Sequence, residues 1–328
     1  MSHHLRYISW SIAFCAFNAS TVAAQGPGPA FPSKPIRIVV PAAPGGASDL
    51  LSRMLGGPLT KAVGQQVIID NRTGAGGQIG CEAVARAAAD GHTLLFWDYG
   101  SLTIAPAVRP AFPFNPSRDF KAVTVVSYSP HLLAVHPSVP VSNVRGLIAL
   151  AKARPGKLNY AAANLGAAPH LAGALFAQLS GITWEYIPAK GGSQAISDVA
   201  SGQSDVLFNS ALATLPHVRS GRLKLLGVSS AQRVKLLPDT PTIIESGLAE
   251  FVTGSWQGML APAATPLDAI ATLNREVVKI LVQPDMRSKL EAMSADTIAN
   301  SAEQAHAFLV GEQTRWADVV KRAGIKLE

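Results

Sequence analysis

Twice in this chain of 328 residues a short apolar strand pattern leads into a glycine-bearing loop and then into the start of a helix. The first runs from Ile36–Val40 into Pro41–Asp49, and the second from Leu158–Ala161 into Asn164–His170. Such a loop directs unpaired backbone N–H groups and the positive end of a helix dipole toward one point. The pair therefore predicts one anion site that two separate lobes hold from both sides.

Strand and helix patterns alternate along most of the chain, which favours parallel sheets covered by helices. Extended segments are predicted over Ile36–Val40, Gln66–Asp70, Thr93–Trp97, Val123–Val126, Leu132–Val135, Leu158–Ala161, Thr183–Ile187, Asp205–Phe208, Leu223–Ser229 and Phe251–Leu260. Helices are predicted over Ala47–Val63, Gln78–Ala88, Val144–Ala153, Pro169–Ser180, Ser193–Ser201, Pro266–Leu281, Pro284–Met293 and Ser301–Ala323. A proline-rich passage, Ala105–Pro116, interrupts the pattern between the two halves.

These patterns predict an α/β protein of two lobes, each a mostly parallel sheet flanked by helices. The helical tail has no sheet of its own, so we expect it to pack on the first lobe. Lobe 1 would then comprise residues 30–128 plus 254–328, and lobe 2 residues 129–253. The chain would cross between the lobes near Ser127–His131 and Phe251–Ser255. Ligands of open α/β sheets bind beyond the carboxyl ends of the strands, where both glycine loops lie.

Residues 1–24 are predicted to be a signal peptide. Basic residues precede an apolar stretch from Ile8 to Phe17, and small residues end at Ala24, near which cleavage is expected. The mature chain would therefore be exported to the periplasm. A lipid anchor on Cys15 is disfavoured, because bulky Phe14 precedes it. Cleavage leaves Cys81 as the one cysteine, so no internal disulfide can form.

Charge and motif content exclude several classes of function. The 28 Lys and Arg residues are scattered among 21 Asp and Glu without a basic run, so we expect no nucleic-acid partner. No metal-ligand spacing, phosphate-binding loop or nucleophile elbow occurs, so we expect no metal, no cofactor and no enzyme activity. Gly74–Gly80 resembles a dinucleotide loop, but Ile79 occupies the third glycine position, which favours a compact turn.

Each candidate ligand residue also has a purely structural interpretation. Ser48 and Asp49 suit the first turn of a helix, whether or not the neighbouring N–H groups bind an anion. His170 is either a ligand donor or a satisfied residue of its helix turn. Lys190 either points into the cleft or is solvated. The segment Trp97–Ser101, at the end of a predicted strand, either walls the pocket or covers its rim.

The order of motifs resembles the substrate-binding receptors of tripartite tricarboxylate transporters, the Bug receptor family. The resemblance extends through nearly the whole mature chain. It rests on Pro35–Pro41, Pro44–Asp49, Asn71–Gly77, Asp90–Leu95, Ala151–Lys157, His170-Leu171, Pro188–Gly191, Leu237–Thr242 and Trp256–Gly258.

The resemblance implies a two-lobed periplasmic-binding-protein fold, type II-like, that closes on a small organic carboxylate. It implies delivery of that carboxylate to a membrane permease with one large and one small subunit; we expect the receptor to be a monomer. The ligand-binding candidates are Ala43, Gly45, Gly46, Ala47, Ser48, Asp49, Trp97, Tyr99, Ala162, Asn164, Gly166, Ala167, His170, Lys190 and Asp205.

Four positions depart from the family pattern, and at one of them Asn164 stands where the family carries a glycine. Ala162 and Ala167 stand where the family carries hydroxyls, and Ala189 stands where it carries a tyrosine. A polar ligand group left without such partners loses about 1–3 kcal/mol. We therefore expect a ligand less polar than a tricarboxylate or an amino acid, such as an aliphatic or aromatic monocarboxylate. Weakened or lost binding is the competing explanation.

Two other functions remain open at this stage. A sensory adaptor would bind the same ligand but dock onto a receptor kinase. A hydrolase or transferase would need an activated nucleophile near His170, and none stands in its loop.

Overall fold

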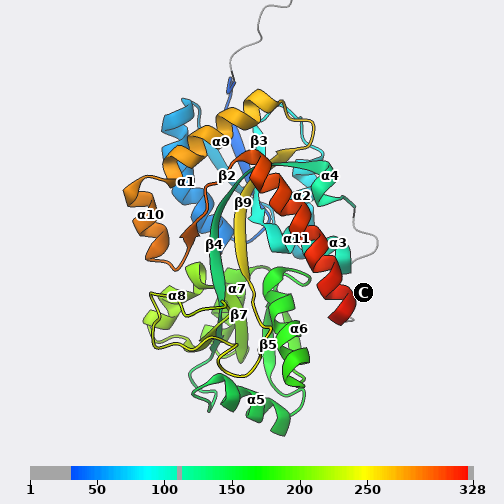
Figure 1. Ribbon diagram of the computed structural model, residues 1–328, viewed down its shortest axis with the longest axis vertical. Helices are drawn as coiled ribbons and strands as arrows, with labels where there is room; N and C mark the ends of the chain where they lie inside the picture. Colours follow the sequence, from blue (N-terminus) through cyan, green and yellow to red (C-terminus); the bar gives the residue numbers. More distant parts are fainter. Residues whose placement is uncertain (1–30, 109–112, 324–328) are drawn as a thin grey trace, which may run out of the picture. The chain divides into compact units, whose positions relative to one another are not determined.

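The computed structural model describes residues 31–108 and 113–323. The predicted signal peptide, with Cys15 and the expected cleavage near Ala24, lies outside the described residues. Within them, helices and strands build two sheets that share one long strand (Figure 1). No helix of these segments is both long and apolar enough to cross a bilayer.

The first sheet is built on three parallel strands followed by antiparallel ones. β1 (Ile36–Val40) lies between β2 (Val67–Asn71) and β3 (Thr93–Asp98) and runs parallel to both. β9 (Gly254–Pro262) pairs antiparallel with β3. The next strands in the sheet are β4 (Phe120–Val135) and the short β10 (Asp296–Thr297).

The second sheet repeats this plan. β5 (Asn159–Ala163) lies between β6 (Glu185–Ala189) and β7 (Val206–Ser210), again in parallel. β7 and β8 (Lys224–Val228) both pair antiparallel with β4. Each sheet was expected to be mostly parallel, and three strands of each are. Both sheets are mixed, because the strands that run between the lobes pair antiparallel with these strands, β9 with β3 in the first sheet and β4 with β7 in the second.

β4 belongs to both sheets. Its residues Phe120–Pro130 pair with β9 in the first sheet, and His131–Val135 pair with β7 in the second. The sequence predicted two short strands here, and the structure has one strand of 16 residues. An apolar core on each side explains the continuity, since nearly every residue of β4 is buried.

The two crossings between sheets are tied together at His131. The His131 N–H donates to Ser229 Oγ (2.8 Å), the His131 carbonyl accepts the Ser229 N–H (2.9 Å), and Thr253 N–H donates to the Ser229 carbonyl (3.1 Å). The imidazole contacts Thr253 Oγ1 at 3.0 Å and Ser255 Oγ at 3.3 Å. Burial lowers the pKa of His131 to about 3 and so keeps the ring neutral.

The first sheet carries α1 (Ala47–Val63) and α2 (Gln78–Ala85), the latter after a 3-10 turn at Ala75–Gly77. Gly80 lets α2 approach the sheet closely, because a Cβ there would lie 2.8 Å from the Arg72 carbonyl oxygen. This confirms the compact turn predicted for Gly74–Gly80.

The helical tail packs on the first sheet, as predicted. It comprises α9 (Leu267–Leu281), α10 (Pro284–Glu291) and α11 (Ala302–Ala323). Leu273, Val277 and Leu309 join the same buried cluster as Val125 of β4. The Phe308 ring lies 4.8 Å from that of Trp256 on β9.

The second sheet is covered by α5 (Val144–Ala153), α6 (Ala168–Ser180), α7 (Gly192–Ala200) and α8 (Ala211–Arg219). Its core is aromatic: the Tyr160 ring stacks on Trp184 at 4.8 Å, and Phe176 stacks on Trp184 at 5.5 Å. Phe208 and Phe251 complete this group, with ring centres 5.2 Å apart.

Three helices were not predicted: α3 (Tyr99–Val108), the short α4 (Pro116–Asp119) and α8. α3 is buried along most of its length, so its apolar residues show no one-sided helical period. Pro106 belongs to the proline-rich passage that was expected to interrupt the pattern, yet it lies near the end of α3, and Pro216 lies near the end of α8.

A matched pair of tyrosines tests this core. Both rings are fully buried. Tyr160 Oη donates to the Pro169 carbonyl and accepts the Phe208 N–H, whereas Tyr99 Oη has no hydrogen-bond partner among the described residues. Tyr160→Phe should lower the free energy of unfolding by about 1–3 kcal/mol, and Tyr99→Phe should leave it equal or raise it. Guanidinium denaturation measures both, and equal losses would contradict the prediction.

Candidate functional site

The loop after β1 forms the first part of the site. Gly45 adopts φ +84°, and its N–H donates to Asp49 Oδ2 at 2.8 Å. Asp49 also accepts Arg53 Nε at 3.0 Å. Burial opposes ionisation of Asp49, but the hydrogen bonds from Arg53 and Gly45 outweigh it and lower its pKa. Asp49 therefore holds the loop in shape.

The start of α1 keeps its backbone donors free of side-chain caps. Gly46 is the N-cap residue and makes no side-chain cap. The Ser48 hydroxyl donates instead to Gln257 Oε1 on β9, at 2.6 Å, and both residues are buried. The first-turn N–H groups of Ala47 and Ser48 are thus of the kind that bind an anion at a helix N-terminus. Gln257 was not among the sequence candidates, although it lies within the motif Trp256–Gly258.

The loop after β5 has a similar construction. Asn164 adopts the left-handed conformation (φ +53°), donates its N–H to the Ala189 carbonyl at 2.9 Å and accepts the Ala167 N–H at 2.8 Å. Ala167 is the N-cap residue of α6 and cannot cap it with its methyl group. Gly166 N–H donates to His170 Nδ1 at 3.1 Å. Because Nδ1 accepts, a neutral His170 carries its proton on Nε2.

The loop after β6 approaches the first loop across the two sheets. A Cβ on Gly45 would lie 3.6 Å from Ser193 Cβ, and one on Gly191 would lie 3.4 Å from the Ala43 nitrogen. Gly191 is the N-cap residue of α7, which also has no side-chain cap. Lys190 is exposed, as its solvated interpretation requires, and its backbone N–H donates to Gln194 Oε1.

The loop after β3 approaches the second loop in the same way. Ser101 Oγ, at the start of α3, accepts the Ala168 N–H at 3.1 Å and donates to Asp98 Oδ1 at 2.7 Å. Burial raises the pKa of Asp98 to about 6; hydrogen bonds from Ser101 oppose the shift, and the charge of Glu312 adds to it. Asp98 and Ser101 belong to the segment Trp97–Ser101, for which the sequence left open whether it walls the pocket or covers its rim; neither was among the ligand-binding candidates.

The four loops therefore meet at one place. Those after β1 and β3 lie at the carboxyl edge of the parallel strands in the first sheet, and those after β5 and β6 at the corresponding edge of the second. The contacts described above join the β1 loop to the β6 loop and the β3 loop to the β5 loop. Pro41–Asp49 and Asn164–His170 are thus linked through two intermediate loops, and a shared anion site between them stays a prediction.

Four candidate residues lie outside this group of loop contacts. Trp97 is 5 % exposed, and its Cζ2 would lie 3.0 Å from a Cβ on Gly77. Tyr99 is buried beside Phe308, and Ala162 lies in the core of the second sheet. Asp205 precedes β7 and accepts the Asn159 N–H at 2.7 Å, so it lies at the amino end of the parallel strands, opposite the loops.

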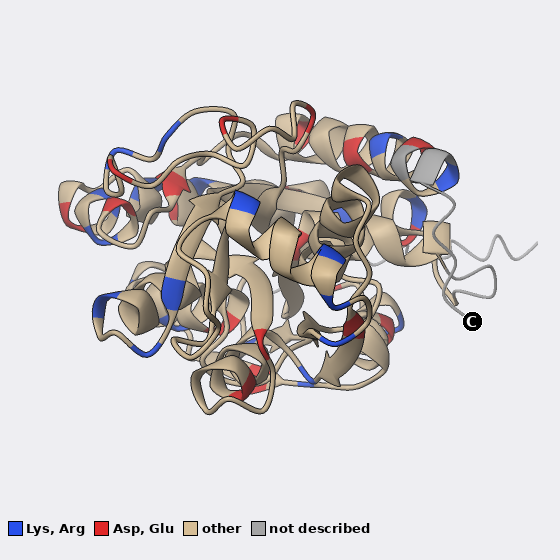
Figure 2. Ribbon diagram, turned by 90° about the horizontal axis from the view of Figure 1, so that it is seen from below, with Lys and Arg blue, Asp and Glu red and all other residues tan. Residues whose placement is uncertain are grey.

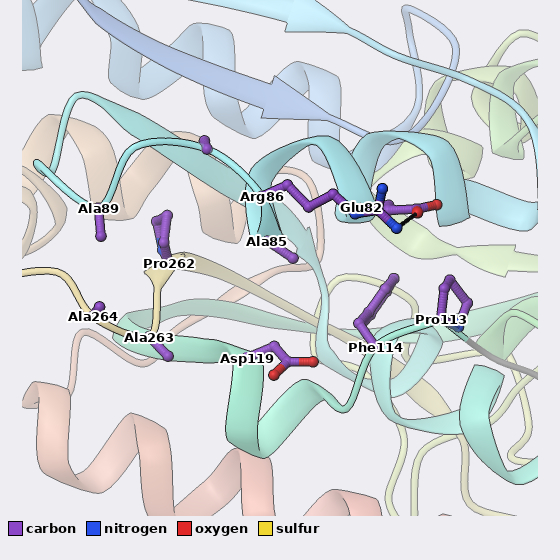
Figure 3. A pocket seen from close by; sticks show the side chains of 11 residues that line it. Glu82, Ala85, Arg86, Ala89, Pro113, Phe114, Asp119, Pro262, Ala263 and Ala264 are labelled. Carbon is purple, nitrogen blue, oxygen red and sulfur yellow. Dashed lines mark ion pairs between the residues drawn. The ribbon is translucent and has the colours of Figure 1, made fainter.

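A pocket of about 390 Å³ lies away from these loops, and none of its lining residues was a candidate (Figure 3). It is bordered by α2, the segment Pro113–Asp119 and the end of β9. No group of three or more His, Cys, Asp or Glu within residues 31–108 and 113–323 is placed to hold a metal ion. Figure 2 shows Lys and Arg interspersed with Asp and Glu over the face drawn.

Comparison with known proteins gives the class and then the family. BugT of Bordetella pertussis is 35% identical over 299 residues, which cover 91% of this chain and 92% of BugT. An R. palustris protein solved with adipate has a TM-score of 0.87 at 32% identity, covering 90% of this chain and 99% of that one. MatC from Rhodopseudomonas palustris, with bound malate, has a TM-score of 0.85 at 30% identity, covering 88% and 100%.

The fold is that of a periplasmic solute-binding protein, and the predicted two-lobed architecture is confirmed. Residues 51–325 match the model of the tripartite tricarboxylate transporter family receptor. The chain belongs to this family of receptors, as the order of its motifs predicted.

The role assigned to Asp49 gives a pH-dependent prediction. Because the pKa of Asp49 is lower in the folded protein, its ionised carboxylate stabilises the fold at pH values above its unfolded pKa of about 3.9. This stabilisation is lost as the pH falls through the lower pKa of the folded state. Asp49→Asn should therefore lower the free energy of unfolding by about 1 kcal/mol at pH 7. The loss is kept small because the partner Arg53 is half exposed. Below the folded pKa of Asp49 the substitution should not change the free energy of unfolding.

Denaturant titrations between pH 7 and pH 3 measure the difference between wild type and variant. Asp239→Asn, at an exposed position, is the matched control and should change stability by less than about 0.5 kcal/mol throughout. If the difference in free energy of unfolding between wild type and Asp49→Asn grows toward pH 3, Asp49 does not hold the loop as described.

Proposed function

We propose that this receptor captures a small carboxylate between its two sheets and delivers it to a tripartite permease with one large and one small membrane subunit. It acts as a monomer in the periplasm, after a signal peptide is removed near Ala24. The observation that supports this function is the approach of two helix starts without side-chain caps, α1 from one sheet and α7 from the other. A Cβ on Gly46 would lie 4.0 Å from the Ser193 nitrogen.

A carboxylate suits these termini for electrostatic reasons. Each uncapped helix start presents backbone N–H groups and about half a unit of positive charge. His170 adds an Nε2–H donor in its neutral form, because its Nδ1 accepts from Gly166. The chain carries a formal net charge of +7, which favours the approach of anions.

Binding would proceed by rotation of the lobes about the crossings at β4 and β9. The ligand gains contacts from both sheets only when the loops meet, so each lobe alone would bind weakly. The hydrogen bonds around His131 fix where the chain crosses, and the strand itself remains continuous on either side.

The ligand class follows from the alanines that replace polar residues. Ala162 and Ala189 are buried among apolar side chains, and Ala167 supplies no hydroxyl at the start of α6. Relatives were solved with adipate and malate, both small carboxylates. We place the ligand at the less polar end of this class, as an aliphatic or aromatic carboxylate.

We propose binding without turnover, since the chain belongs to a family of receptors with the fold of a solute-binding protein. His170 Nδ1 accepts a backbone N–H of its own loop, and the ring lies edge-on to Tyr186 at 5.0 Å. Carboxylates incubated with the protein should therefore be recovered unchanged.

Calorimetry against a panel of adipate, malate, citrate, benzoate and aspartate tests the function. Gly46→Leu should weaken binding of the best ligand more than about tenfold, a loss of 1.4 kcal/mol. A Cβ on Gly46 would lie 3.7 Å from the Ala43 carbonyl oxygen and 4.0 Å from the Ser193 nitrogen, so the rest of a leucine side chain would compete for the space between the β1 and β6 loops.

Gly57→Leu is the control, because it lies in the same helix with nothing within 4 Å of its Cβ position. It should leave the affinity unchanged. Failure of every carboxylate to bind would overturn the proposed function, and tight binding of citrate or aspartate would overturn the less polar ligand class.

A further inference from the structure

The N-terminus of α6 is capped from the opposite lobe. Ala167 has no hydroxyl, and Pro169 in the first turn has no N–H. The Ala168 N–H donates to Ser101 Oγ on α3, which follows the first sheet, at 3.1 Å. Because α3 follows β3 of the first sheet and α6 follows β5 of the second, this bond exists only while the two lobes are in contact.

Asp98 fixes the direction of the Ser101 hydroxyl. Asp98 Oδ1 accepts both the Ser101 N–H at 2.6 Å and the Ser101 O–H at 2.7 Å. With its hydrogen committed to Asp98, Ser101 Oγ presents a lone pair toward Ala168. Asp98, Ser101 and Ala168 are 3 %, 6 % and 1 % exposed, so water is excluded from the bond.

An apolar contact between the lobes surrounds this bond. Ile104 and Val108 of α3, Trp316 and Val320 of α11, and Ala168 and Leu171 of α6 form one buried cluster. A Cβ on Gly100 would lie 3.4 Å from Ala168 Cβ, so α3 and α6 are in close contact. Trp316 Nε1 donates to Glu312 Oε2 at 3.0 Å, which fixes the indole at this contact.

We propose that Asp98 and Ser101 form a latch that stabilises the closed arrangement of the lobes by capping α6 across the cleft. Both act as positioning residues of the carboxylate site, since the latch orders the start of α6 and, with it, the loop Asn164–His170. The inference rests on the lobe closure proposed above. Opening the lobes would leave the Ala168 N–H without its partner and the α6 terminus without a cap.

Three variants separate the latch from ordinary helix capping. Ser101→Ala removes the acceptor, and Ser101→Thr keeps a hydroxyl. Ala167→Ser combined with Ser101→Ala provides a local cap instead. An N-cap serine bonds the second or third N–H of the helix. With Pro169 in the second position, Ser at 167 would bond His170 N–H and leave Ala168 N–H unpaired.

The distance between the lobes is measured by pulsed electron spin resonance without any ligand. Leu267→Cys on α9 and Leu179→Cys on α6 provide exposed label sites, 73% and 40% exposed, one on each lobe. Cys81 is buried, and burial raises its thiol pKa well above the usual range, so it reacts poorly with the label. Amide exchange of Ala168 and guanidinium denaturation are measured on the same variants.

Ser101→Ala should increase the fraction of molecules with a long distance between the two labels. It should also accelerate exchange of the Ala168 N–H by up to about tenfold, which corresponds to the loss of one hydrogen bond. Ser101→Thr should retain the wild-type distances. The double variant should regain unfolding stability but keep the longer distances and the fast Ala168 exchange.

Restoration of the short distances by Ala167→Ser would overturn the latch, because capping alone would then suffice. Unchanged distances in Ser101→Ala would overturn it as well. The distance measurement needs no carboxylate, so failure of the latch can be told from failure of the ligand panel.

Discussion

Strand β4 constrains the rest of the structure, because its backbone is hydrogen-bonded in both sheets. It pairs with β9 over Phe120–Pro130 and with β7 and β8 over Leu132–Val135. Breaking it would leave buried N–H and C=O groups unpaired, which is costly. The lobe closure proposed above would therefore concentrate at the crossing near His131, where a few side-chain hydrogen bonds join β4 to Ser229 and Thr253.

The site follows from this connection. Parallel strands place every following loop at one edge of a sheet, and β4 brings two such edges together. Helices α1, α6 and α7 begin there without side-chain caps of their own. Alanine at the N-cap of α6 forgoes local stabilisation of about 1 kcal/mol, and glycine at those of α1 and α7 forgoes roughly a few tenths of that. In return, backbone donors remain for partners from the opposite lobe, of which Ser101 is one.

Elements with a one-sided apolar period could be predicted closely from the sequence. β1, α1 and α5 have the predicted bounds. α3 and α8 could not be predicted, because α3 is buried nearly all round and each contains a proline near its end. The glycine loops were identifiable because left-handed backbone at Gly45 and Gly166 favours that residue. Asp205 is a polar residue beside a strand like the other candidates, but it lies at the amino end of the parallel strands, whereas the glycine loops follow their carboxyl ends.

The sequence by itself determined the local chemistry: where strands run into glycine loops, which helix starts carry no capping side chain, and which motifs relate the chain to its receptor family. These are properties of neighbouring residues. The tertiary structure alone decided which loops meet across the lobes, that Ser48 bonds Gln257 and that Ser101 caps α6. Those pairs lie 209 and 67 positions apart in the sequence, and only the path of β4 and β9 between the sheets brings such distant residues within hydrogen-bonding distance.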